Sequence, residues 1–209
     1  MLFTTPNQIG IDYFVTGLQS GLYRRLKKVW GVTDQTYNCF GRAYRNMVEG
    51  GYIAEFYNAE AQNYVSGLNQ SNQGGMFFED TIAAMSYILC DQPVKNSSGT
   101  YNVKAQLLFF VNLDMITPYG LTPTQQAGQR MDEAAVNDVV DYIQANGNNW
   151  TVTATYTDVD KVLERFSGKQ KRESLNDDMH PRFCFRIDMS LNYNRLLNRV
   201  NMIPNSFLT

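Results

Sequence analysis

Histidine and cysteine are scarce in this sequence. Its 209 residues include one histidine, His180, and three cysteines, Cys39, Cys90 and Cys184. A single histidine removes most Ser/His/Asp and Cys/His catalytic sites and the zinc sites that use several histidines. The cysteines are odd in number and far apart, which excludes a disulfide framework and a CxxC redox pair. We therefore expect a reducing compartment, with Cys90 and Cys184 as buried thiols in apolar strands.

Net charge is also small, and long apolar runs are missing. Eighteen Lys and Arg residues against twenty Asp and Glu residues give a formal net charge of −2, so the chain lacks the basic field that non-specific DNA binding needs. A protein that lines a DNA passage without gripping the DNA is compatible with this balance.

No stretch approaches the roughly 18 uninterrupted apolar residues of a membrane-spanning helix, and residues 1–10 have no signal-peptide pattern. We expect neither a signal peptide nor a membrane span.

Apolar and aromatic side chains are plentiful. Hydrophobic residues make up 44% and aromatic residues 13% of the chain, which favours a packed globule. A chain of this length is more often one domain than two. We expect a single domain, residues 1–209, with polar or charged exposed loops near 58–75, 92–101 and 168–181 and a C-terminal tail, 194–209, that has no partner within itself.

Two long helices are predicted by their periodicity. In residues 11–30 an apolar side chain recurs every four positions, basic residues crowd the last turns, and Gly31 follows. Residues 131–146 carry acidic residues in the first turn and are followed by Gly147. Both segments have one apolar face, so each is expected to pack on a sheet.

A third, short helix is expected before the charged segment 168–181. Thr157 and Asp160 have the spacing of a capping box, which places Thr157 at the helix N-cap. The helix is then expected to run to Phe166, because Ser167 and Gly168 follow it.

Strands are expected where apolar residues alternate or form short runs. Strand 105–115 is apolar on both faces, which predicts a central strand covered on both sides. In strand 150–156 the apolar residues at even positions are expected to share one half-buried face. The remaining strands are expected at 85–91 and 182–193, and in a hairpin formed by 37–44 and 52–57. The element order predicts an α+β fold, with a mixed or antiparallel sheet flanked by a long N-terminal helix and two further helices.

The acidic residues suggest no catalytic or metal site. Asp177 and Asp178 supply too few oxygen ligands for a hard cation, so a solvated acidic turn is the expected structure. Asp114 lies at a strand end, and Asp158 and Asp160 lie at a helix start, where each has a structural use. We predict a protein that is not an enzyme and has no catalytic residues, metal or cofactor.

One basic run is the candidate for a DNA-facing or interface surface. It is interleaved with Glu164 and Glu173, so a merely solvated face is the alternative. Its members are Lys161, Arg165, Lys169, Lys171 and Arg172.

The second half of the chain resembles a known group of virion proteins. The resemblance is carried by the succession of helix 131–146, strand 150–156, helix 158–166 and the final strand in PRFCFRIDMSLNY, residues 181–193. This layout and the chain length resemble the head-to-tail connector and tail-terminator, or tail-completion, proteins of tailed bacteriophages. Among these it resembles in particular the ring proteins beneath the portal of crAss-like phages.

The resemblance implies a structural virion protein of the tail or neck, assembled in the host cytoplasm. It implies a homo-oligomeric ring of twelve or six copies, stacked against portal, other connector or tail proteins. Genomic DNA would pass through the lumen without sequence-specific binding. Two alternatives stay open: a small non-enzymatic protein-binding adaptor domain of a bacterial cell, and another capsid or tail component.

Overall fold

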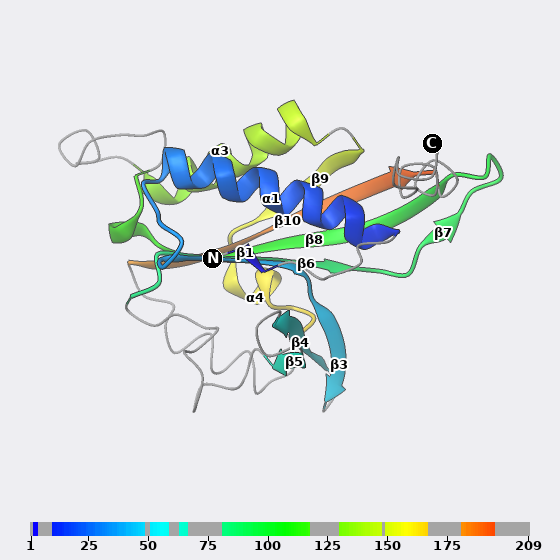
Figure 1. Ribbon diagram of the computed structural model, residues 1–209, viewed down its shortest axis with the longest axis horizontal. Helices are drawn as coiled ribbons and strands as arrows, with labels where there is room; N and C mark the ends of the chain where they lie inside the picture. Colours follow the sequence, from blue (N-terminus) through cyan, green and yellow to red (C-terminus); the bar gives the residue numbers. More distant parts are fainter. Residues whose placement is uncertain are drawn as a thin grey trace, which may run out of the picture.

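The fold is a two-sheet α+β arrangement with elements on both sides of the larger sheet (Figure 1). The computed structural model describes residues 2–3, 10–48, 51–58, 63–66, 81–117, 130–147, 149–166 and 181–194. The predicted fold class is confirmed, while the single-domain organisation stays a prediction. No described helix combines the length and apolar character needed to cross a membrane.

The larger sheet is mixed. Its strands are ordered β1-β2-β6-β8-β10-β9, and β7 pairs with one end of β8. The pairs β1/β2 and β2/β6 are parallel, whereas β6/β8, β8/β10 and β10/β9 are antiparallel. The strands are β1 (Leu2–Phe3), β2 (Tyr37–Arg42), β6 (Ala84–Cys90), β7 (Val94–Lys95), β8 (Tyr101–Asn112), β9 (Trp150–Tyr156) and β10 (Arg182–Tyr193).

Helices α1 (Ile11–Val29) and α3 (Met131–Asn146) cover the first face of this sheet (Figure 1). Their apolar sides share one core with the alternate side chains of β8 and β10 that point to this face. Two buried hydrogen bonds fix the packing. Trp30 Nε1 donates to Asp138 Oδ2 over 2.9 Å, and Gln19 Nε2 donates to the Phe40 carbonyl over 2.8 Å. Both predicted long helices are confirmed.

The second face carries α4 (Val159–Val162) and a smaller antiparallel sheet of β3 (Tyr44–Val48), β4 (Gly51–Asn58) and β5 (Asn63–Ser66) (Figure 1). Leu108 and Phe110 of β8 belong to the core on this side, while Leu107 and Phe109 belong to the core under α1 and α3. The prediction of a central strand covered on both faces is confirmed. The strand starts earlier than expected and ends at Asn112, where Leu113–Met115 form a 3-10 turn, η1.

A β-bulge in β9 corrects the prediction that its even-numbered residues share one face. Val152 pairs with Met189, and Ala154 pairs with Asp188, so Thr153 is an extra residue between them. Trp150 and Val152 pack on the first face, whereas Tyr156 packs on the second. One inserted residue reverses the alternation because side chains in a strand point to opposite faces in turn.

The segment 37–44 does not form one arm of a hairpin, as predicted. Residues Tyr37–Arg42 form β2 of the larger sheet, parallel to β6. The hairpin consists instead of β3 and β4, with Val48 opposite Gly51. A strand of the larger sheet and an arm of a hairpin can show the same alternation of apolar and polar residues. The sequence therefore did not reveal that the chain passes from the larger to the smaller sheet at Ala43.

Two segments expected to be loops contain strands. Residues Asn63–Ser66 of the expected loop 58–75 pair with β4 as β5. Residues Val94–Lys95 of the expected loop 92–101 pair with β8 as β7. The remainder of 58–75 apart from Asn58, loop residues 168–180 and tail residues 195–209 lie outside the described residues.

The N-cap of α4 is Asp158, not Thr157. The Asp158 carboxylate accepts hydrogen bonds from the backbone N–H groups of Asp160 at 2.9 Å and Lys161 at 3.3 Å. The helix is also shorter than predicted and ends at Val162. A carboxylate is as good a cap as a hydroxyl and sits one residue nearer to the first turn here.

Candidate functional site

The second face of the larger sheet changes from apolar to polar along β8, and β10 beside it carries polar side chains there. Near α4 it carries Leu108 and Phe110 of β8. Toward β7 every alternate side chain on the same face is polar, and opposite residues of the two strands form matched pairs. We call these six residues the polar face: Asn102, Lys104 and Gln106 of β8, opposite Asn192, Ser190 and Asp188 of β10.

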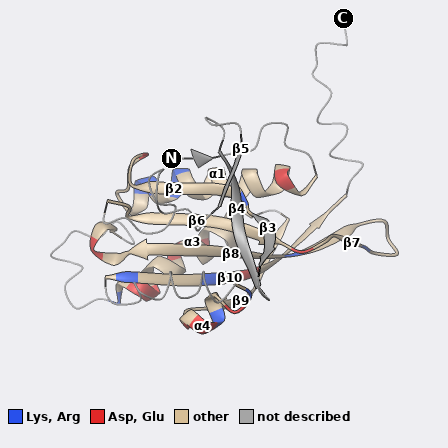
Figure 2. Cartoon of the chain, turned by 90° about the horizontal axis from the view of Figure 1, so that it is seen from below, with Lys and Arg blue, Asp and Glu red and all other residues tan. Residues whose placement is uncertain are grey.

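A hollow of about 420 Å³ lies on the polar face. Its floor includes Lys104, Gln106, Asp188 and Ser190, and residues of other elements complete its wall. These include Thr153 at the β9 bulge. The bulge therefore helps to shape this hollow. Figure 2 shows this side of the molecule, with α4 beside β9 and β10 and the β7 end of the sheet projecting beyond them.

Gln106 is the unusual member of the polar face, because it is only 6% exposed. No residue that the structure describes forms a hydrogen bond with its carboxamide. Lys104 is exposed, and its ammonium has no ion-pair partner in the described part of the chain. Buried amides are nearly always hydrogen-bonded. Gln106 lines the hollow, so water or another molecule in the hollow can hydrogen-bond with its carboxamide.

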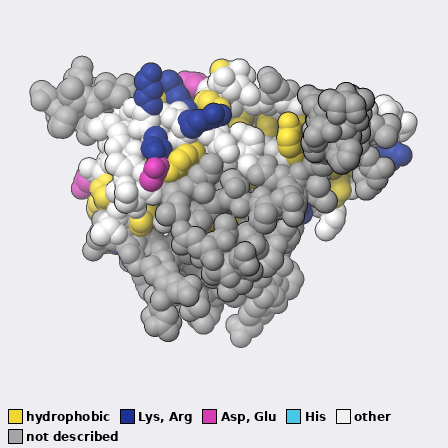
Figure 3. Space-filling view, viewed as in Figure 1, with side chains coloured by type: hydrophobic (Ala, Val, Ile, Leu, Met, Phe, Trp, Pro, Cys, Tyr) yellow, Lys and Arg dark blue, Asp and Glu magenta, His cyan; other side chains and the backbone are white. Residues whose placement is uncertain are grey.

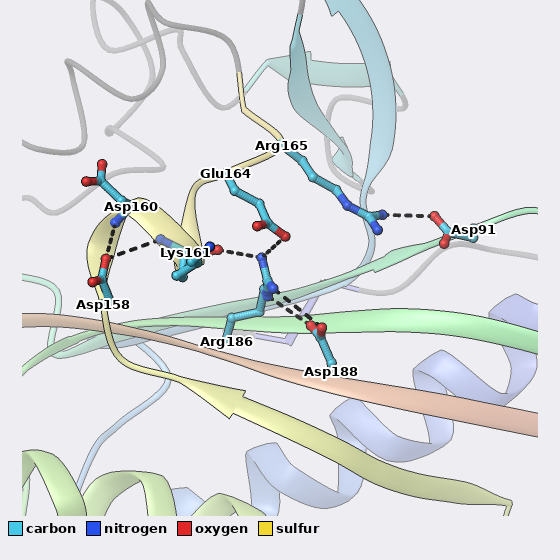
Figure 4. Close-up of polar contacts among 8 residues, drawn as sticks. All are labelled: Asp91, Asp158, Asp160, Lys161, Glu164, Arg165, Arg186 and Asp188. Carbon is cyan, nitrogen blue, oxygen red and sulfur yellow. Dashed lines mark hydrogen bonds and ion pairs between the residues drawn. The ribbon is translucent and has the colours of Figure 1, made fainter.

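Arg186 holds α4 against the sheet beside this hollow (Figure 4). Its guanidinium forms ion pairs at 2.9 Å with Glu164 Oε1 and with Asp188 Oδ1, and Nη1 also donates to the Lys161 carbonyl. The guanidinium lies over the Tyr156 ring at 4.3 Å from the ring centroid. This is a structural network, because its buried charge is already matched by two carboxylates.

The predicted basic run is only partly described, and one of its described members is neutralised. Arg165 Nη1 lies 3.1 Å from Asp91 Oδ1 at the rim of the hollow (Figure 4). Lys161 is exposed on α4; its backbone N–H donates to the Asp158 cap, and its carbonyl accepts from Arg186. The other three members, Lys169, Lys171 and Arg172, lie outside the described residues.

A second basic cluster lies on the opposite side of the sheet, at the end of α1. Figure 3 shows Lys and Arg side chains gathered over this half of the helix. Arg24, Arg25 and Lys28 are exposed and have no ion-pair partner among the described residues, while Lys27 pairs with Asp34. The sequence indicated these cations only as a complement to the helix dipole. They are the better candidates for contact with a phosphate backbone.

The acidic residues that were considered for chemistry have structural roles where they are described. Asp158 caps α4, and Asp160 donates its backbone N–H to that cap. Asp114 donates its backbone N–H to Asn112 Oδ1 in η1. No three His, Cys, Asp or Glu side chains come together as metal ligands within the described ranges. Asp177, Asp178 and His180 fall outside them.

The cysteines are described in all three positions and are free thiols. Cys39 and Cys90 are buried, and Cys184 is half-buried against the second core. Burial raises the pKa of Cys39 to about 11. A thiol with that pKa is almost wholly protonated at neutral pH and is a poor nucleophile.

Comparison with known proteins adds no relative. No protein-family model matches the chain, and a search of curated proteins finds no significant match.

Proposed function

We propose that this chain is a structural subunit of a homo-oligomeric ring in the head-to-tail connector of a tailed bacteriophage. The elements that carry the resemblance are present in the expected order: α3, β9, the short α4 and the long β10. Their layout supports the proposal, and the polar face gives it a physical basis. The ring would lie in the neck of the virion and surround the path of the DNA.

The observation that carries the proposal is the buried Gln106 on the polar face. A cyclic ring joins one surface of a subunit to a different surface of its neighbour. The Gln106 carboxamide and the exposed Lys104 ammonium offer five N–H donors and one acceptor oxygen beside a hollow of about 420 Å³. A polar or acidic segment of the neighbouring subunit would satisfy both groups. An isolated subunit would instead leave Gln106 to water.

The edge strand β9 adds a second element of the same surface. It is the last strand in the order of the larger sheet, and Thr151, Thr153 and Thr155 along it are exposed. Edge strands present unpaired backbone groups to which a neighbour can hydrogen-bond. The polar face and this edge are adjacent, so one partner surface would contact both.

The basic cluster at the end of α1 supports a lumen-facing surface. The cluster contributes three cations that have no ion-pair partner among the described residues, so it would hold the DNA weakly and without sequence preference. Repetition around a ring would still line the passage with positive charge. Weak, repeated contacts suit a passage through which DNA must slide.

Counting the chain in purified particles tests the proposed role. Quantitative mass spectrometry of phage particles would scale this chain against the portal and major capsid proteins. Roughly six or twelve copies per particle are expected for ring closure. Hundreds of copies would favour a capsid or tail-tube component instead. Absence from particles would overturn the virion proposal and favour the cellular adaptor.

Two variants test the proposed interface on the recombinant protein. Gln106→Leu removes the polar group at constant size, so the subunit is expected to keep its thermal stability but to lose the ring in native mass spectrometry. Lys28→Glu is the matched control, because it changes a charge on the opposite side of the sheet and should leave the ring intact. A ring that persists in Gln106→Leu would contradict the assignment of the polar face.

A further inference from the structure

An aromatic groove of about 490 Å³ lies between α1 and α3, on the side of the sheet opposite the polar face. Tyr13, Phe14 and Gly17 of α1 form one wall, and Tyr142 of α3 and Trp150 at the start of β9 lie across from them. Apart from Trp150, which begins the edge strand β9, these residues lie outside the surfaces assigned above to the ring interface and the DNA.

The groove leaves aromatic surface open to solvent. Tyr13 is 46% exposed, one of only two large hydrophobic side chains that are exposed in the described part of the chain. Gly17 and Gly21 of α1 show where the groove is open and where the two helices touch. A Cβ on Gly21 would lie 1.9 Å from the Tyr142 hydroxyl, whereas a Cβ on Gly17 would meet nothing within 4 Å. The helices are therefore in close contact at Gly21 and open at Gly17.

The chain leaves the sheet beside this groove. Strand β10 ends at Tyr193. The Tyr193 ring packs on Phe14, with centroids 5.3 Å apart, and stacks on Tyr101 at 5.5 Å. Phe14 itself lines the groove. The residues that follow Asn194 therefore start within reach of the groove and need no linker to enter it.

Residues 195–209 have a composition that complements the groove. Their only charged residues are Arg195 and Arg199. The last turn of α3 has no basic residue, and Asp141 on that helix is exposed. The C-terminal end of a helix carries partial negative charge and favours cations nearby. The apolar residues of the segment are Leu196, Leu197, Val200, Met202, Ile203, Phe207 and Leu208.

We propose that residues 195–209 bind in the α1–α3 groove of their own chain. The apolar side chains would cover Tyr13 and Trp150, and the two arginines would lie near the end of α3. Binding within the same chain follows from the position of Tyr193, because a tethered segment has a high effective concentration at an adjacent site. The docked segment would close an aromatic patch that otherwise favours non-specific association. The proposal does not depend on the ring or on the phage assignment.

Hydrogen exchange on the full chain tests this docking. Residues 195–209 are expected to exchange at least roughly tenfold more slowly than a free peptide of the same sequence. Gly17→Phe fills the open part of the groove and should abolish that protection. Gly17→Ala is the matched control, because it adds one methyl group, leaves the groove open and should keep the protection. Exchange at the free-peptide rate in the unmodified chain would overturn the proposal.

A second measurement separates the chain's own groove from that of another copy. Trp30 is fully buried, so acrylamide quenching of fluorescence reports mainly on Trp150. A chain that ends at Asn194 is expected to show several-fold stronger quenching, which a synthetic peptide of residues 195–209 should reverse. Protection of residues 195–209 should also be independent of protein concentration. Protection that is lost on dilution would place the segment on a second copy and overturn binding within the same chain.

Discussion

Arg186 carries its charge with a side chain that is only 3% exposed. Its partners come from two elements: Glu164 follows α4, whereas Asp188 lies on β10 itself. The network therefore connects the end of α4 to the central part of the sheet. The exposed ion pair between Arg130 and Asp132, by contrast, joins two neighbouring residues.

Arg186→Met is expected to lower the free energy of unfolding by about 3 kcal/mol, because it leaves the half-buried Asp188 carboxylate without its partner. Urea denaturation followed by circular dichroism measures this change. Arg25→Met is the control, since Arg25 is exposed and such changes usually fall within about 0.5 kcal/mol. Equal midpoints for the two variants would contradict a structural role for Arg186.

Asp34 gives a stability effect that depends on pH. Hydrogen bonds from Lys27 and Tyr23 hold the pKa of its carboxyl below the usual value. A lowered pKa in the folded state stabilises the protein above the pKa of the unfolded chain, and this contribution disappears as the pH falls through the lowered pKa. The Tm difference between the unmodified protein and Asp34→Asn should thus be largest near neutral pH and shrink as the pH falls through the lowered pKa. Thermal unfolding across that range measures it, and a constant difference would contradict the assignment.

Among the helices and strands, the sequence predicted those that are marked by residues within the element itself or next to its ends. Helices 11–29 and 131–146 have a clear helical period and end before Gly31 and Gly147, and both were found as expected. Strand 182–193 alternates over its whole length and was also predicted. The switch of sheets at Ala43 and the bulge at Thr153 were missed, because each depends on which strand lies alongside.

The candidate site was less predictable than the fold. Arg165 looked like a free cation in the sequence, but its partner Asp91 lies in a distant segment. Gln106 lies in a strand that was recognised by its apolar residues, so its missing partner could not be seen. One signal was present: β8 changes from apolar to polar on this face, and the same face of β10 is polar at Asp188, Ser190 and Asn192. Only the antiparallel register brings the two polar halves together.

The two residues that compete for the α4 cap are readily separated by mutation. Asp158→Ala is expected to lower the free energy of unfolding by about 1 kcal/mol, because two backbone N–H groups lose their acceptor. Thr157→Ala should stay within about 0.5 kcal/mol, since Thr157 is exposed and does not cap the helix. Urea denaturation measures both variants. A larger effect for Thr157→Ala would restore the capping box that the sequence suggested.

The bulge in β9 is tested by deletion. Removing Thr153 leaves Val152 opposite Met189 and Ala154 opposite Asp188 with no residue between them, so the pairing becomes regular and every side chain keeps its face. We expect the deletion variant to keep its core, with an ordinary loss of about 0.5–3 kcal/mol. Thr153→Ser keeps the extra residue and should be tolerated. Thermal unfolding compares the two variants, and a loss of more than about 4 kcal/mol on deletion would contradict the assignment of Thr153 as the extra residue.

For the whole molecule, the two cores share their central strands. Ile88 and Leu107 belong to the core under α1 and α3, while their neighbours Tyr87 and Leu108 belong to the core under α4. Loss of either core exposes one face of β6 and β8. We therefore expect one cooperative unfolding transition, with equal calorimetric and van't Hoff enthalpies. Two resolved transitions in differential scanning calorimetry would contradict the prediction of a single domain.

The position of β10 has a consequence for synthesis on the ribosome. It is the last described strand of the chain, yet it lies between β8 and β9 in the middle of the sheet order. Until residues 182–193 have emerged, β8 and β9 have no common partner, and the long apolar β8 has an unprotected edge. The nascent chain must therefore wait for β10 before the larger sheet can close. Premature termination before residue 182 would leave an aggregation-prone fragment, and only a chain that includes β10 could complete the sheet.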